Sequence, residues 1–188
     1  MRARFYNYLN LSCVISRKAE IIGSANISIG AYTRIHDHAI IQCSGWGKPE
    51  VLQGEIVIGD HCSIQPYAYL HSVGGRIEIG DYCSINPYSV LYGGGGLTIG
   101  NHVRIAAHAV IVPSNHKFDN VDVPIHLQGN SKLGILIEDD VWIGARVCIL
   151  DGVKIAKGCV IGAGSIVTKS TEAYGVYVGI PARRIKDR

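Results

Sequence analysis

The hydrophobic residues of this 188-residue chain return with a period of six through most of its length. From Ile137 to Val167 an aliphatic residue occupies every sixth place, and a small residue follows it four places later in most of the repeats. This period fits neither a helix of 3.6 residues per turn nor an isolated strand of period two. It fits a triangular coil of about 18 residues, with three short strands and three corners. The pattern therefore predicts an all-β chain, a parallel β-helix of hexapeptide repeats.

The same period recurs upstream in sets of three aliphatic residues. These sets are Ile29/Ile35/Ile41, Ile58/Ile64/Leu70, Ile79/Ile85/Leu91 and Ile99/Ile105/Ile111. Stacked coils would pair as parallel strands about 4.8 Å apart and align the aliphatic residues inside the prism. Small residues suit the narrow interior, and Gly, Asn and Asp suit the corners. Tyr67, Tyr88 and His108 would then share one column.

Longer spacings mark segments that leave the coil. We expect one excursion at about 42–57, which includes Trp46, and another at 113–134. Long insertions on a repeat scaffold usually carry function. The β-helix would span 27–180, with 1–26 as a cap over the first coil; a membrane-surface anchor is the alternative for 1–26. A short C-terminal helix is expected at 181–188, because proline suits the first helical position at Pro181.

Composition narrows the functional classes. The net charge of +3 and a pI near 8.5 are too mild to indicate nucleic-acid binding. No transmembrane run or signal peptide is seen, which predicts a cytoplasmic protein. Cys62, Cys83 and Cys159 fall in the inward column of small residues, so we expect structural thiols and no metal.

The C-terminal half carries an ordered set of motifs. They are Ser-Asn-His-Lys-Phe at 114–118, Pro-Ile at 124–125, Gln-Gly at 128–129, Ile-Glu-Asp-Asp-Val-Trp-Ile-Gly-Ala at 137–145, Val-Ile-Gly-Ala-Gly-Ser-Ile-Val-Thr-Lys at 160–169, and Gly-Ile-Pro-Ala-Arg at 179–183. This set resembles the left-handed β-helix acyltransferases, in the branch of maltose, galactoside and polysaccharide O-acetyltransferases. The resemblance implies a left-handed coil, acetyl-coenzyme A as co-substrate, and a homotrimer with active sites between subunits. Parallel crossovers are usually right-handed, so the hand rests on the resemblance alone.

The resemblance implies two catalytic residues. His116 would be the general base, since an imidazole can take a proton from a hydroxyl near neutral pH; the alternative is an exposed loop histidine. Asn86 matches an asparagine that contacts the acceptor hydroxyl, the alternative being an ordinary corner residue. The acidic N-terminal residue that the family uses in its acceptor pocket has no secure match here.

The cofactor groove is implied in the same way. Trp142 should point outward beside the pantetheine arm, or else make a trimer contact. A backbone amide near Gly144 or Ala145 would stabilise the oxyanion of the thioester. The other expected cofactor-binding residues are Ala106, Ala163, Gly164, Thr168, Lys169 and Arg183. The two basic residues among them could meet the coenzyme phosphates, or simply lie on a solvated surface.

The resulting hypothesis is acetyl transfer from acetyl-coenzyme A to a sugar hydroxyl, in surface polysaccharide or glycan biosynthesis. N-acetylation of a nucleotide-linked amino sugar is the main alternative. A zinc site like that of the β-helix carbonic anhydrases is disfavoured, because His102 and His108 would lie on different faces of one coil. A non-catalytic β-helix scaffold is the remaining possibility.

Overall fold

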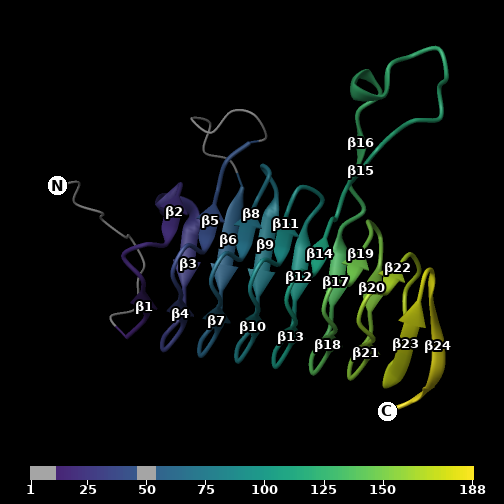
Figure 1. Cartoon of the computed structure of the whole chain (residues 1–188). Helices are drawn as coiled ribbons and strands as arrows, with labels where there is room; N and C mark the ends of the chain where they lie inside the picture. Colours follow the sequence, from purple (N-terminus) through teal and green to yellow (C-terminus); the bar gives the residue numbers. More distant parts are fainter. Residues whose placement is uncertain (1–11, 46–53) are drawn as a thin grey trace.

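The chain winds as a left-handed parallel β-helix, as predicted (Figure 1). The computed structural model describes residues 12–45 and 54–188. Over these residues the strands form three parallel faces of a prism, and a fourth small sheet lies in the large excursion. In Figure 1 the coils follow one another in sequence order along the prism, and the excursion stands well clear of it.

The strands of each face are related by one turn of the coil. The nine-stranded sheet contains β1 (Val14–Ile15), β4 (Arg34–Ile35), β7 (Ser63–Ile64), β10 (Ser84–Ile85), β13 (Arg104–Ile105), β18 (Trp142–Ile143), β21 (Val160–Ile161), β23 (Gly175–Gly179) and β24 (Ala182–Asp187). The seven-stranded sheet contains β2 (Glu20–Ile22), β5 (Ile40–Gln42), β8 (Tyr69–His71), β11 (Val90–Tyr92), β14 (Val110–Ile111), β19 (Cys148–Ile149) and β22 (Ile166–Val167). The six-stranded sheet contains β3 (Ile27–Ile29), β6 (Glu55–Ile58), β9 (Arg76–Ile79), β12 (Leu97–Ile99), β17 (Ile135–Ile137) and β20 (Lys154–Ile155).

The register of the sheets places the aliphatic repeat inside the prism. Ile29 pairs with Ile58, and Ile99 pairs with both Ile79 and Ile137. The aliphatic residues of the four upstream sets are at most 3% exposed. The small residues at the fifth place, such as Cys62 and Cys83, are buried as well. The core is therefore a continuous aliphatic column, which is what the six-residue period predicts.

Three corners join the faces. We call the turns between the six- and nine-stranded sheets the first corner, those between the nine- and seven-stranded sheets the second, and those between the seven- and six-stranded sheets the third. At the first two corners the residue before the small position has a positive φ in every complete coil. Most of these residues are not glycine, and aromatic side chains stack along the corners. Tyr32, His61, Tyr82 and His102 stack along the first corner, and His38, Tyr67, Tyr88 and His108 along the second, with ring centroids 4.7–5.1 Å apart.

Both termini differ from the prediction. The β-helix begins before residue 27, because β1 and β2 already pair with β4 and β5 of the next coil; residues 1–11 of the predicted cap lie outside the described residues. The predicted helix at 181–188 is wrong, because β24 pairs antiparallel with β23. Eight residues are too few for a stable isolated helix, whereas β23 offers a free edge of backbone hydrogen-bonding groups.

Both excursions leave from the third corner. The first runs between Gln42 and Glu55, and its middle part, with Trp46, lies outside the described residues. The second leaves after β14 and returns at β17. It holds the two-stranded sheet of β15 (Asn115–His116) and β16 (Asn130–Ser131), together with a 3-10 turn at Ile125–Leu127; a second such turn lies at Ser24–Asn26. Over the described residues, no helix has the length and apolar character needed to cross a membrane.

Candidate functional site

Six of the expected site residues line up along the second corner. The backbone N–H of Asn86 donates to Ile105 O (2.9 Å), that of Ala106 to Ile143 O (2.9 Å), and that of Gly144 to Ile161 O (2.8 Å). These ladder bonds place the three residues directly beneath one another in successive coils. Ala145, Ala163 and Gly164 continue the same corner toward the C-terminus, with Gly164 N–H donating to Ala145 O (2.8 Å).

The residues at the second corner differ between the middle coils and the last ones. Tyr88 and His108 stand at its positive-φ places in the middle coils, whereas Arg146 and Gly164 follow in the last ones. At Gly144 an added Cβ would lie 2.6 Å from Ala163 N and 2.8 Å from Ile161 O, so only glycine fits without a backbone shift. Gly144 is thus buried and allows the coils to pack closely, whereas Ala163 and Gly164 in the next coil are exposed, with open space beside Gly164 for a slender ligand such as a pantetheine arm.

The hydrogen bonds narrow the choice of oxyanion donor. The Gly144 amide already donates to Ile161 O within the ladder and cannot also serve a substrate. The Ala145 amide donates no hydrogen bond within the described parts of the chain, and the Ala145 side chain is too small to shield it. Of the two expected donors, only Ala145 N–H suits the role of binding a developing negative charge.

The side chain of Asn86 is held in a fixed orientation. Its Nδ2 donates to Ile105 O at 2.9 Å, and the residue is half-buried. This bond assigns the amide group, because only the nitrogen can donate to a carbonyl. Oδ1 is thereby left as the group that can accept a hydrogen bond from an acceptor hydroxyl.

Trp142 and Arg183 lie on the nine-stranded sheet. Trp142 points outward, 56% exposed, between Arg104 and Val160 on the adjacent strands, as the narrow interior requires. Arg183 lies on β24 at the last edge of that sheet, exposed and paired in register with Val178.

His116 lies at the third corner, away from the residues of the second. It is exposed on β15, opposite Asn130 on β16, at the base of the excursion. A hollow of about 280 Å³ opens beside it, lined by Val73, Tyr92, Val112, Ser114, Asn115, His116 and Asn130. Thr168 and Lys169 also leave toward this corner, directly after β22, and both are exposed.

A single chain therefore does not assemble the expected site. His116, Thr168 and Lys169 lie at the third corner, where the strands of the seven-stranded sheet end. Asn86, Ala145 and Gly164 lie at the second corner, where those strands begin.

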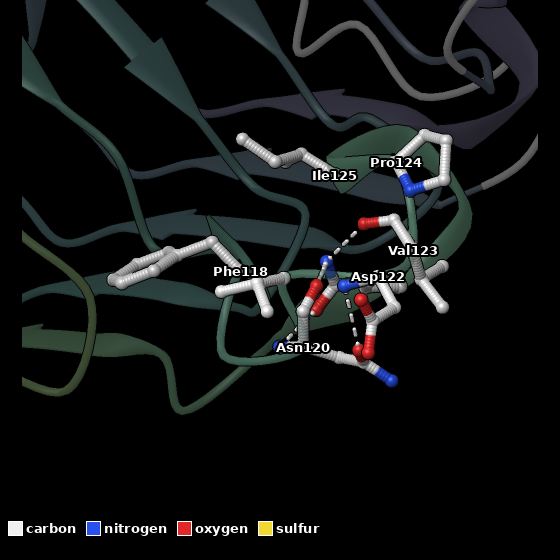
Figure 2. Close-up of a pocket in the computed structure, with 8 residues that line it drawn as sticks. Phe118, Asn120, Asp122, Val123, Pro124 and Ile125 are labelled. Atoms are coloured by element: carbon white, nitrogen blue, oxygen red, sulfur yellow. Dashed lines mark hydrogen bonds between the residues drawn. The ribbon is translucent and has the colours of Figure 1, made fainter.

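The tip of the excursion forms a second hollow, of about 540 Å³, shown in Figure 2. The Gln128 amide ties the tip together by donating to Asn120 O (2.8 Å) and Val123 O (2.7 Å). Phe118, Val121 and Ile125 are 55–93% exposed there. This hollow is not lined by His116, and its apolar surface is of a kind that marks a protein contact more than a catalytic pocket.

Sequence reasoning missed a polar cluster behind the His116 hollow. His71 is only 3% exposed and contacts Ser44 and Tyr69 through its two ring nitrogens. Burial lowers the pKa of His71, and a hydrogen bond to the Ser44 backbone opposes this only in part. The available signal was a histidine at a repeat position where Val112 and Leu150 stand in later coils.

The comparisons with known proteins agree with the repeat. Residues 134–169 match the family model described as bacterial transferase hexapeptide (six repeats). The galactoside O-acetyltransferase of Lactococcus lactis is 35% identical over 133 residues, covering 69% of this chain and 63% of that protein. The chain spans less than two thirds of the length of the first curated relatives it matches.

Solved structures share the fold. The crystal structure of AntD, an N-acyltransferase from Bacillus cereus in complex with dTDP-4-amino-4,6-dideoxyglucose and coenzyme A, superposes with a TM-score of 0.63 at 25% identity, covering 95% of this chain and 82% of that one. The polysialic acid O-acetyltransferase OatWY superposes with a TM-score of 0.69 at 22% identity, covering 93% and 84%. The resemblance to the hexapeptide-repeat acetyltransferases, in the branch that includes the galactoside O-acetyltransferases, is thereby confirmed.

Proposed function

We propose that the protein is a homotrimeric, cytoplasmic acetyltransferase that moves the acetyl group of acetyl-coenzyme A to a sugar hydroxyl in surface glycan biosynthesis. The observation that carries the proposal is the division of the site between the second and third corners, at opposite ends of the strands of one sheet. His116 lies beside a hollow at the third corner, and the glycine and alanine residues lie at the second. The 35% identity to a galactoside O-acetyltransferase supports a sugar hydroxyl as the acceptor.

The outer face of the seven-stranded sheet supports self-association. One column of its outward positions carries Ile40, Tyr69, Val90, Val110, Cys148 and Ile166, on the opposite side of the strands from the buried core residues. The six-stranded sheet instead presents charged side chains and ion pairs, such as Lys154–Glu138 (2.6 Å) and Arg76–Glu78 (3.2 Å). An apolar face of this length is typical of a surface covered by another copy of the chain.

A three-fold arrangement through this face would complete the site. When three prisms turn the same face toward a common axis, the third corner of each meets the second corner of its neighbour. His116 of one subunit would then face Asn86 and Ala145 of the next. The apolar tip of the 113–134 excursion would reach the neighbour and cover the groove between them.

In this groove His116 would act as the general base. Its imidazole takes the proton from the acceptor hydroxyl as the hydroxyl oxygen attacks the thioester carbonyl. Asn86 Oδ1 orients that hydroxyl, and Ala145 N–H stabilises the oxyanion. The imidazolium then returns the proton to the departing thiolate. No covalent enzyme intermediate is required, because both substrates meet in one groove.

The remaining site residues suit the binding of acetyl-coenzyme A. Ala163 and Gly164 are exposed, with open space beside Gly164 for the pantetheine arm, and Trp142 offers an exposed ring. Lys169 and Arg183 are exposed cations at the C-terminal end of the prism, where they could pair with the coenzyme phosphates.

The test separates catalysis from cofactor binding. His116→Ala should lower turnover by about 10²–10⁴-fold and leave acetyl-coenzyme A affinity nearly intact, measured by thiol release and calorimetry. Lys169→Ala should do the opposite and mainly weaken cofactor affinity. Full turnover in His116→Ala would remove this histidine from the mechanism.

N-acetylation of a nucleotide-linked amino sugar is the second candidate. The resemblance to AntD, solved with dTDP-4-amino-4,6-dideoxyglucose, favours it. Thiol release with a dTDP-linked amino sugar but not with simple sugars would replace the first proposal by this one.

A further inference from the structure

The hollow beside His116 extends toward the N-terminal coils. Val73 and Tyr92 belong to coils that precede the one carrying His116. The expected cofactor residues lie in the coil of His116 or in later ones. If the coenzyme occupies the C-terminal side of His116, the Tyr92 side is left for the acceptor.

A closed circuit of hydrogen bonds lies behind Tyr92. Gln42 Nε2 donates to Ser44 Oγ (2.7 Å), and Tyr69 Oη donates to Gln42 Oε1 (2.9 Å). His71 joins the two ends, with Nε2 3.2 Å from Ser44 Oγ and Nδ1 3.1 Å from Tyr69 Oη. When His71 carries its hydrogen on Nδ1, every hydrogen in the circuit has one acceptor.

The other neutral tautomer fits less well. It would direct Nε2–H toward Ser44 O, which lies 3.2 Å away. Tyr69 would then face two acceptors, Gln42 Oε1 and His71 Nδ1, with a single hydrogen. The circuit is therefore complete only with a neutral imidazole protonated on Nδ1, and such a network fixes the position of its members.

Tyr92 rests against this circuit. It lies beside His71 in the sheet register, and its ring stands nearly perpendicular to that of Tyr69, at 82° and 6.2 Å between centroids. Its ring is also 6.2 Å from that of His71, at 66°. Edge-to-face contacts of this kind set a ring's orientation. The circuit thus holds the wall of the hollow in one place.

The fold alone does not require polar residues at these positions. The strand that follows β11 carries Val110 in line with Tyr69 and Val90, and later coils carry Cys148 and Ile166 there. Aliphatic residues pair well at these places, whereas a buried polar circuit must satisfy every member. A role in shaping the hollow accounts for the free-energy cost of burying these polar groups, which packing alone does not explain.

We propose that Tyr92, positioned by the circuit of Gln42, Ser44, Tyr69 and His71, forms the acceptor subsite and takes a single sugar ring. The inference rests on the proposed acetyl transfer and names its acceptor site. The C–H face of the ring packs on Tyr92, while Ser114, Asn115 and Asn130 offer hydrogen-bonding groups to its other hydroxyls. The hollow, of about 280 Å³, has room for one sugar ring.

The first test measures binding without turnover, with methyl β-galactoside as the probe and saturation-transfer NMR as the readout. Tyr92→Leu, which keeps apolar bulk but removes the flat ring, should weaken binding at least about tenfold. Tyr82→Leu, an exposed ring of the first corner, is the matched control and should bind like the wild type. Unchanged binding by Tyr92→Leu overturns the proposal, as does a wild type that does not bind the probe.

The second test addresses the circuit. Tyr69→Phe removes one hydroxyl and should raise the KM for the acceptor several-fold while leaving the KM for acetyl-coenzyme A unchanged. A merely structural role would lower the Tm and leave both KM values alone, and that outcome would refute the positioning role. If the wild type binds the galactoside yet releases no thiol, the proposed acetyl transfer fails and the binding subsite stands.

Discussion

The proposal that each active site combines the third corner of one subunit with the second corner of the next can be tested by mixing two inactive variants. His116→Ala damages only the third corner, and Asn86→Ala damages only the second. In a cyclic trimer each site takes His116 from one subunit and Asn86 from the next. A site is therefore intact wherever an Asn86→Ala subunit, which keeps His116, precedes a His116→Ala subunit around the ring.

The expected magnitude follows from this geometry. In randomly assembled trimers from equal amounts of the two variants, about one site in four has both intact residues. Once the inactive homotrimers are removed, every mixed trimer holds one intact site among its three, so mixed trimers should recover about a third of the wild-type rate, although each parent alone is nearly inactive. If both residues served the same site from one chain, every site would carry one defect and no activity would return.

The assay needs subunits that exchange before measurement. The two variants are co-expressed with different affinity tags, mixed trimers are isolated through both tags, and thiol release is compared with each parent at equal concentration. A mixture of separately assembled trimers is the control. Activity no higher than the mean of the parents would refute the intersubunit site and the three-fold packing from which it was argued.

Two further predictions follow from the fold. Val110→Lys places a charge in the apolar face of the seven-stranded sheet, and an unpaired charge is costly to bury. The variant should therefore be monomeric by light scattering and at least about tenfold less active in thiol release. Thr98→Lys on the exposed six-stranded face is the control, and a trimeric Val110→Lys would show that another face is used. Because the folded-state pKa of His71 lies below its ordinary 6.5, the unfolded chain binds the proton first as pH falls, so this contribution to stability is full above about 6.5 and is lost below it. The Tm of the wild type should therefore fall more than that of His71→Gln between about pH 8 and pH 5, and parallel curves would contradict the assignment.

The sequence by itself determined the coil. A residue such as Ile99 must be buried, and a six-residue period can bury every such residue only in a three-sided prism. For that reason the strands, the inward small column and the position of the second excursion all followed from local spacing. The hand of the coil and the roles of His116, Asn86 and Trp142 came from resemblance and not from spacing.

Only the tertiary structure decided how the site residues combine. Hydrogen bonding to Ile161 O removes the Gly144 amide from use, which no spacing rule states. The end of the chain became a strand because β23 offered a partner edge. The circuit around His71 joins residues 27 positions apart, so it exists only once the coils are stacked. The six-residue period determines whether a side chain faces the core or the solvent. Whether its polar groups remain free to bind a substrate depends on contacts between coils that are distant in sequence.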